Sequence, residues 1–144
     1  MRVAELVFAL LLIIAPFSVY AEMDEKVVHL AKQHIVTLNV AGLTHTLTPL
    51  LERGGFPAEE HPEIIGRVGW EIASCIVDAL EQDSSPISQA AILEISDGAD
   101  FATGKINFEH LYTEDEFEEY ANAYGRISAE CNAAVFEKNY LIVR

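Results

Sequence analysis

The stretch PEIIGRVGWEIASCIVDALEQ, residues 62–82, decides the fold of this chain. Its apolar residues recur every three to four positions, so they share one face of a helix. A second stretch, FEEYANAYGRISAECNAAVF at residues 117–136, has the same periodicity. Two such helices bury their apolar stripes against each other. The stripes consist of Ile65, Val68, Ile72, Cys75, Ile76 and Ala79 in the first stretch, and of Phe117, Tyr120, Tyr124, Ile127, Cys131 and Val135 in the second.

The two cysteines of the chain, Cys75 and Cys131, fall one on each stripe. An oxidising compartment favours pairing them, and both would point to where the two helices meet. We therefore predict a structural disulfide between them. A redox pair is disfavoured, because there is no Cys-x-x-Cys spacing to lower a thiol pKa. Two buried free thiols and an intermolecular bridge are the alternatives.

Helical periodicity also precedes the central stretch. The first expected helix covers about residues 24–48, with a kinked continuation through Pro49 to Arg53 as the alternative, and Gly54 with Gly55 ends it. The central helix then starts near Glu59 or at Pro62. Within it, Gly66 and Gly69 are expected to let a neighbouring backbone come close.

Two further helices are expected after the central one. Ser85-Pro86 opens a short helix to about Ile95, which Asp97-Gly98 closes. The sequence TEDE at residues 113–116 is a capping box and opens a last helix that runs to about Lys138. A short helical turn at 108–111 would be unsurprising between them. The sequence predicts an all-α, single-domain bundle of about four helices, stapled by one disulfide.

The first 21 residues have the layout of a secretory signal peptide. Arg2 precedes the apolar run LVFALLLIIAPF at residues 6–17, and small or aliphatic side chains precede a cleavage site after Ala21. The run is too short to span a bilayer, which needs about 20 apolar residues. We predict a signal peptide at 1–21, a helical domain at 22–144, and export to the periplasm or the medium. A buried N-terminal helix of a cytosolic protein is the alternative.

The chain carries 23 acidic and 9 basic residues, for a net charge of −14. This excess repels nucleic acid and anionic membrane surfaces, and it attracts basic partners. Solubility alone is the simpler explanation. We therefore expect no nucleic-acid partner and no stable membrane insertion.

Residues 33–51 contain no Asp, Glu, Lys or Arg. On a helical wheel, one side of this stretch is apolar and the other is polar but uncharged. Such a face suits contact with a second subunit or a ligand. The alternative is a central helix covered on both sides by its own domain. The residues of this candidate interaction face are His34, Thr37, Thr44, His45 and Thr48.

A compact acidic patch at the start of the last helix is a second candidate docking surface. It could meet a basic groove, or it could be a solvated helix start that complements the helix dipole. Its residues are Glu114, Asp115, Glu118 and Glu119.

Metal binding and catalysis find little support in the sequence. His34 and His45 would be about 16 Å apart on one helix, too far to share a metal ion. Glu25 and His29 could supply two ligands, but this spacing is common in solvated pairs. The segment from Asp97 to Asp100 lacks the further ligands of a calcium loop. Nucleophile-elbow and phosphate-binding motifs are absent, so no catalytic residue, metal or cofactor is predicted.

These features favour a small exported acidic protein that binds another protein outside the cytoplasm and is not an enzyme. An inhibitory, immunity or assembly role would fit, with a basic partner or a second copy of the chain as the open alternatives. A carrier of a small ligand or metal is the rival function. Its pocket would lie inside the bundle, beside His34, His45 or residues 101–112.

Overall fold

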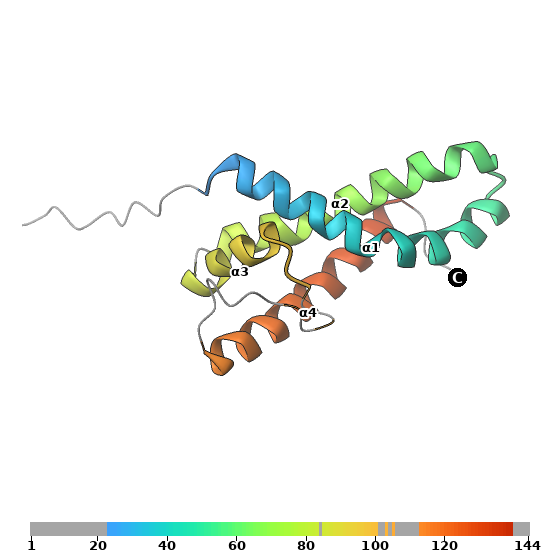
Figure 1. The fold of residues 1–144 in the computed structure, drawn as a ribbon. Coiled ribbons are helices and arrows are strands. Elements are labelled where there is room, and N and C mark those ends of the chain that lie inside the picture. Colours follow the sequence, from blue (N-terminus) through green and yellow to red (C-terminus); the bar gives the residue numbers. More distant parts are fainter. Residues whose placement is uncertain (1–22, 84, 101–102, 104, 106–112, 140–144) are drawn as a thin grey trace, which may run out of the picture.

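The computed structural model describes residues 23–83, 85–100, 103, 105 and 113–139. Within this part of the chain, the predicted all-α bundle of four helices is confirmed (Figure 1). The expected signal peptide and the helical turn at 108–111 lie outside the described residues. The helices are α1 (Glu25–Arg53), α2 (His61–Asp83), α3 (Pro86–Ser96) and α4 (Glu114–Lys138), with the 3-10 turn η1 (Ala58–Glu60) before α2.

Helix α1 takes the longer of its two predicted forms. Asp24 caps its start by accepting a hydrogen bond from the backbone N–H of Lys26 at 2.8 Å. Pro49 lies inside the helix, although it donates no backbone hydrogen bond. The helix continues past it because Leu47 and Leu51, on either side, are both buried in the core. It ends at Arg53, and the following turn uses a glycine at positive φ, 78° at Gly55.

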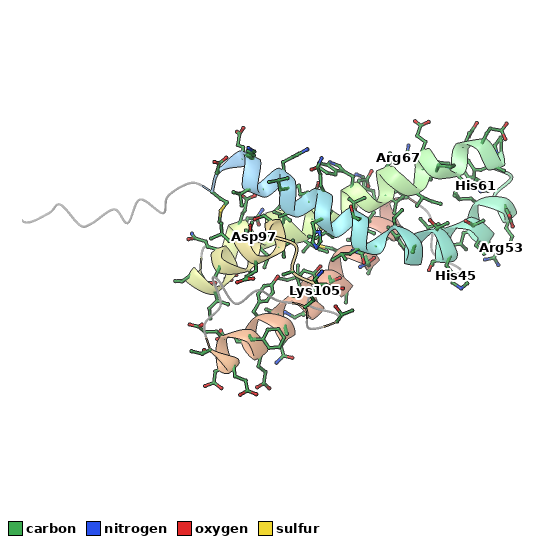
Figure 2. The ribbon with its side chains drawn as sticks, in the orientation of Figure 1. His45, Arg53, His61, Arg67, Asp97 and Lys105 are labelled. Atoms are coloured by element: carbon green, nitrogen blue, oxygen red, sulfur yellow. A yellow bond between two sulfur atoms is a disulfide. The ribbon has the colours of Figure 1, made fainter. Side chains whose placement is uncertain are left out.

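Helix α2 begins at His61, and the 3-10 turn η1 at Ala58–Glu60 runs directly into it. At Gly69 helix α1 does come close, but with a side chain rather than the predicted backbone: a Cβ there would lie 3.3 Å from Cδ1 of Leu43. The prediction for Gly66 is wrong, because that position is exposed and a Cβ there would have no neighbouring element within 4 Å. At the closed end of the α1–α2 hairpin, Nε2 of His61 is 3.0 Å from the carbonyl oxygen of Phe56 (Figure 2).

Helix α2 is the centre of the bundle, since α1, α3 and α4 all pack against it. Helix α3 also packs on α1, whereas the closed end of the hairpin projects away from α3 (Figure 1). Along the middle of α2 and toward its C-terminus, most side chains are therefore buried or partly buried. The exposed side chains there, such as Trp70 and Asp78, form a ridge on the outer side of the helix. The largest core residues are Ile35, Leu47, Leu51, Val68, Ile72, Ile76, Leu80, Ile92, Ile95 and Tyr120.

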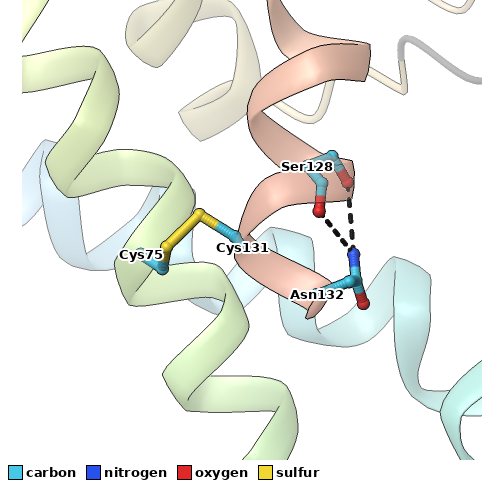
Figure 3. The surroundings of a disulfide bond; sticks show 4 residues. All are labelled: Cys75, Ser128, Cys131 and Asn132. Atoms are coloured by element: carbon cyan, nitrogen blue, oxygen red, sulfur yellow. Dashed lines mark hydrogen bonds between the residues drawn. A yellow bond between two sulfur atoms is a disulfide. The ribbon is translucent and has the colours of Figure 1, made fainter. Parts of the chain in front are cut away.

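The predicted disulfide is confirmed. Cys75 of α2 and Cys131 of α4 are joined across a Cα–Cα distance of 5.7 Å (Figure 3). The predicted capping box is also present at the start of α4. The hydroxyl of Thr113 accepts from the N–H of Glu116 at 3.1 Å, and the Glu116 carboxylate accepts from the N–H of Thr113 at 3.2 Å. Helix α4 is thus fixed at its N-terminus by capping and, nearer its C-terminus, by the disulfide bond at Cys131.

Helix α3 begins at its predicted cap, where the Ser85 hydroxyl accepts from the N–H of Ser88 at 3.1 Å. It ends at Ser96, and Gly98 then adopts a φ of 99°. Beyond it, Asp100 and Lys105 exchange backbone hydrogen bonds of 2.7 and 2.9 Å, an isolated bridge rather than a strand. Glu94 is fully buried in the middle of α3.

Candidate functional site

The uncharged stretch of α1 is largely exposed in its middle. Between residues 37 and 46, Leu43 is buried and the other nine residues are exposed. Two of these are large apolar side chains, Leu38 at 42% exposure and Val40 at 43%. Figure 2 shows His45 directed away from α2. We define the α1 face as Thr37, Leu38, Val40, Ala41, Thr44 and His45, which at 100° per residue fall within an arc of about 160°.

The threonine hydroxyls of the α1 face are satisfied within the helix itself. Thr37 Oγ1 donates to the carbonyl oxygen of Gln33 at 3.0 Å, and Thr44 Oγ1 donates to that of Val40 at 2.7 Å. Both hydroxyls therefore keep a partner if the face is covered. Covering the α1 face consequently removes apolar surface from water while leaving these two polar groups bonded.

The five residues predicted for the interaction face do not all share the same environment. Thr37, Thr44 and His45 are exposed, whereas Thr48 and His34 are partly buried. Nε2 of His34 is shielded from solvent and makes no hydrogen bond among the described residues. Its Cε1 lies 4.0 Å from where a Cβ on Gly98 would be, so the ring sits beside the end of α3. His34 and His45 therefore lie in different surroundings.

A shallow groove of about 280 Å³ lies between α1 and α4, on the side of α1 opposite the α1 face. Leu43 and Thr46 line it from α1, Ile72 forms part of its floor, and Asn132 and Phe136 line it from α4. The amide of Asn132 is turned toward its own helix, where it donates to the carbonyl oxygen of Ser128 at 2.7 Å (Figure 3). The groove has no charged lining residue, but it lies on another side of α1 than the α1 face.

Two further hollows flank Trp70, an exposed aromatic residue that the sequence reasoning did not single out. Each has a volume of about 350 Å³, one toward α1 and one toward α4. The ring of His29 packs against the indole at 5.3 Å between centroids. Glu25 and His29, considered above as metal ligands, both line the hollow toward α1. None of these three hollows contains His34 or His45.

In the described part of the chain, no group of three or more His, Cys, Asp or Glu residues is arranged to hold a metal ion. The acidic patch at the start of α4 is exposed at Glu114, Asp115, Glu118 and Glu119, with all four side chains near the helix N-terminus. Its position suits the helix dipole, which favours negative charge there.

Two tyrosines of α4 lie on the inner side of that helix. Burial raises the pKa of Tyr120 far above its usual value, with a smaller contribution from Tyr124. Burial also raises the pKa of Tyr124, to which the nearby charge of Asp100 adds. Their rings are 5.8 Å apart, and both stay neutral near neutral pH, as suits residues that pack in a core.

The chain matches no protein-family model, and no significantly similar curated protein or solved structure was found. Among the helices of the described residues, none has an apolar stretch of the length required to cross a membrane.

Proposed function

We propose that this chain is a protein-binding module that docks onto another protein through the α1 face. The observation that carries the proposal is the exposure of Leu38 and Val40 within an uncharged stretch of a chain whose net charge is −14. These two side chains lie at opposite edges of the α1 face, about 160° apart around the helix, with Thr37, Ala41 and Thr44 between them. An uncharged, partly apolar face of this kind is typical of interaction surfaces. The internally bonded hydroxyls of Thr37 and Thr44 support it further, because they lower the cost of desolvating the face.

The partner best suited to the α1 face is a second copy of the chain. Two copies repel each other everywhere that their acidic surfaces meet, and a symmetric pairing of α1 faces avoids this by placing uncharged residues opposite uncharged residues. A basic partner would find no carboxylate on the α1 face. It would instead be drawn to the acidic patch at residues 114–119.

The size of the α1 face sets the expected affinity. From Thr37 to His45 the helix rises about 12 Å, and a helix with its side chains is about 10 Å wide. Such a strip is smaller than the face of about 800 Å² per partner that stable complexes bury. We therefore expect weak, concentration-dependent association.

We place this interaction outside the cytoplasm. The disulfide between Cys75 and Cys131 is of the kind that persists in oxidising compartments. The signal-peptide layout of residues 1–21 supports the same location and predicts cleavage after Ala21. The intact mass of the protein purified from the medium or periplasm tests this: the expected chain starts at Glu22, and an uncleaved chain would contradict it.

The proposed association is tested by native mass spectrometry and sedimentation over a concentration series, with and without reductant. The variant is Ala41→Glu, which puts a charge at the centre of the α1 face. The matched control is Ala133→Glu, at an exposed position on α4. We expect a dimer that survives reduction, that Ala41→Glu weakens by about ten-fold or more, and that Ala133→Glu leaves unchanged.

A monomer at all concentrations would overturn the choice of a second copy as partner. The broader proposal is tested separately, with a photo-crosslinking residue placed at Leu38 or at Ala133 in cells that export the protein. Cross-links to one protein from position 38 but not from 133 support docking by the α1 face. Equal or absent cross-links from both positions would refute it.

A further inference from the structure

An exposed apolar cluster covers the closed end of the α1–α2 hairpin. It consists of Phe56, Pro57, Ala58 and Pro62, all of which are exposed, and Phe56 is 47% exposed. Single exposed apolar residues are common on soluble proteins, but three in a row are unfavourable unless they serve a function. This end of the hairpin projects from the rest of the bundle (Figure 1). We define the hairpin tip as residues 52–63.

The backbone of the hairpin tip holds Phe56 in one position. Its N–H donates to the carbonyl oxygen of Leu51 at 3.0 Å, and its own carbonyl oxygen is 3.0 Å from Nε2 of His61 (Figure 2). Gly55, at a φ of 78°, makes the turn that precedes it. The ring of Phe56 lies over Gly54, where a Cβ would be 3.1 Å from two of the ring carbons. An apolar side chain that is already ordered loses little conformational entropy when it binds.

Acidic residues flank the apolar cluster on both helices. The hairpin tip contains four glutamates and one arginine, and all five are exposed: Glu52, Glu59, Glu60, Glu63 and Arg53. Nε of Arg53 donates to the carbonyl oxygen of Pro49 at 3.2 Å, so this arginine folds back along α1. Arg67 follows on α2, and residues 52–67, with four glutamates and two arginines, still carry a net charge of −2. The hairpin tip therefore presents an apolar cluster within a negatively charged surrounding.

The shape and the charge of the hairpin tip select one kind of partner. A projecting apolar side chain fits a concave apolar pocket, and the glutamates beside it fit a rim of lysines and arginines. A second hairpin tip would bring like charges together, and an anionic membrane surface would repel the glutamates. We infer that the hairpin tip inserts Phe56 into an apolar pocket with a basic rim on another protein.

This inference goes beyond the proposed function and does not depend on it. The hairpin tip begins at Glu52, about 10 Å along the helix from His45, where the α1 face ends. A partner bound to the hairpin tip can therefore leave the α1 face open. Either proposal can fail while the other stands.

Photo-crosslinking in cells that make the full chain tests the inference. Phe56 is replaced by p-benzoylphenylalanine, which keeps an aromatic ring at this position, and the control carries the same residue at Ala133, an exposed position on α4. We expect one other protein to be cross-linked from position 56 and not from position 133. Cross-links only to lipid or to a second copy of this chain, equal cross-links from both positions, or none at all would overturn the inference.

Variants of the hairpin tip then test how the cross-linked protein is held, by titration calorimetry with both proteins purified. Phe56→Ala removes the apolar anchor and should weaken binding ten-fold or more. Glu59→Gln with Glu60→Gln should weaken it by about three- to ten-fold at low salt, and this difference should shrink as salt is added.

The matched control, Glu118→Gln with Glu119→Gln, makes the same charge change on α4 and should leave binding unchanged. All five substituted positions are exposed, so the fold is expected to stay intact. The inference is overturned if Phe56→Ala binds as tightly as the wild-type protein, or if the two pairs of charge variants have the same effect.

Discussion

Removing the disulfide tests how much the bundle depends on the bond between α2 and α4. Cys75 and Cys131 are 56 residues apart in the sequence. Without the bond, the unfolded chain gains the freedom that closing this loop had removed. In the chain-entropy treatment, that gain amounts to about 4 kcal/mol of lost stability. A domain of this size is stable by about 5–15 kcal/mol, so the reduced protein should stay folded with little to spare.

The perturbation is made in two ways, by reducing the wild-type protein and by the double variant Cys75→Ala, Cys131→Ala. Reduction keeps both sulfur atoms in the interface, whereas the variant also leaves a small void beside Cys131, which is almost fully buried. The variant should therefore be less stable than the reduced protein by about 1 kcal/mol.

Urea denaturation followed by far-UV circular dichroism measures the loss. With a urea dependence of about 2 kcal/mol per molar, reduction should lower the midpoint by about 2 M. The slope should also rise, because the reduced unfolded chain is more expanded. A midpoint that falls by less than about 0.5 M, at unchanged slope, would refute the reasoning that the bond acts mainly on the unfolded state.

Four other substitutions have clear expected outcomes. Leu47→Ala removes a fully buried side chain and should lower the free energy of unfolding by about 3 kcal/mol in urea denaturation. Leu38→Ala on the exposed α1 face should change that free energy by no more than about 0.5 kcal/mol. Equal losses would contradict the assigned burial. Thr113→Ala breaks the capping box and should destabilise the protein by about 1 kcal/mol, and an unchanged midpoint would show that α4 does not need its cap. Hydrogen bonds from Ser88 and, to a smaller extent, from Ser85 hold the pKa of Asp83 below its usual value of 3.8. The stabilisation from these bonds is complete above about pH 4, and it is lost as the pH falls through the lower pKa that Asp83 has in the folded protein. Ser88→Ala should raise the pKa of Asp83 toward 3.8 in an NMR titration of its carboxyl carbon, and no rise would rule out the Ser88 bond as the main cause.

Helix positions and the disulfide followed from the sequence because they depend on local patterns. The apolar stripe from Ile65 to Ala79 and the capping box at Thr113 can each be recognised from residues that are close together in the sequence. Pro49 was harder to interpret, since its effect depends on whether the helix is held on both sides by buried leucines. Gly66 shows the same limit: a glycine permits a close approach, but only the packing of another helix decides whether one occurs.

The candidate surfaces depend on which side of each helix the rest of the fold covers. A helical wheel placed His34 with Thr37 and Thr44, but α3 and the turn at Gly98 partly cover His34 and leave the threonines free. Leu38 is apolar and would be expected inside, yet 42% of it is exposed. Glu94 is the reverse case, an acidic residue that lies fully buried in α3. Such placements arise from tertiary packing, which a local pattern does not contain.

The bond between α2 and α4 also determines how the molecule would respond to a mechanical pull on its two ends. The load passes from Cys75 to Cys131 through the sulfur atoms and bypasses the 56-residue separation between them. Helix α3 and most of α4 lie within that bypassed loop, whereas α1 lies outside it. Stretching would unravel α1 and leave the loop slack, so the fully extended oxidised chain should be shorter than the reduced one by about 19 nm.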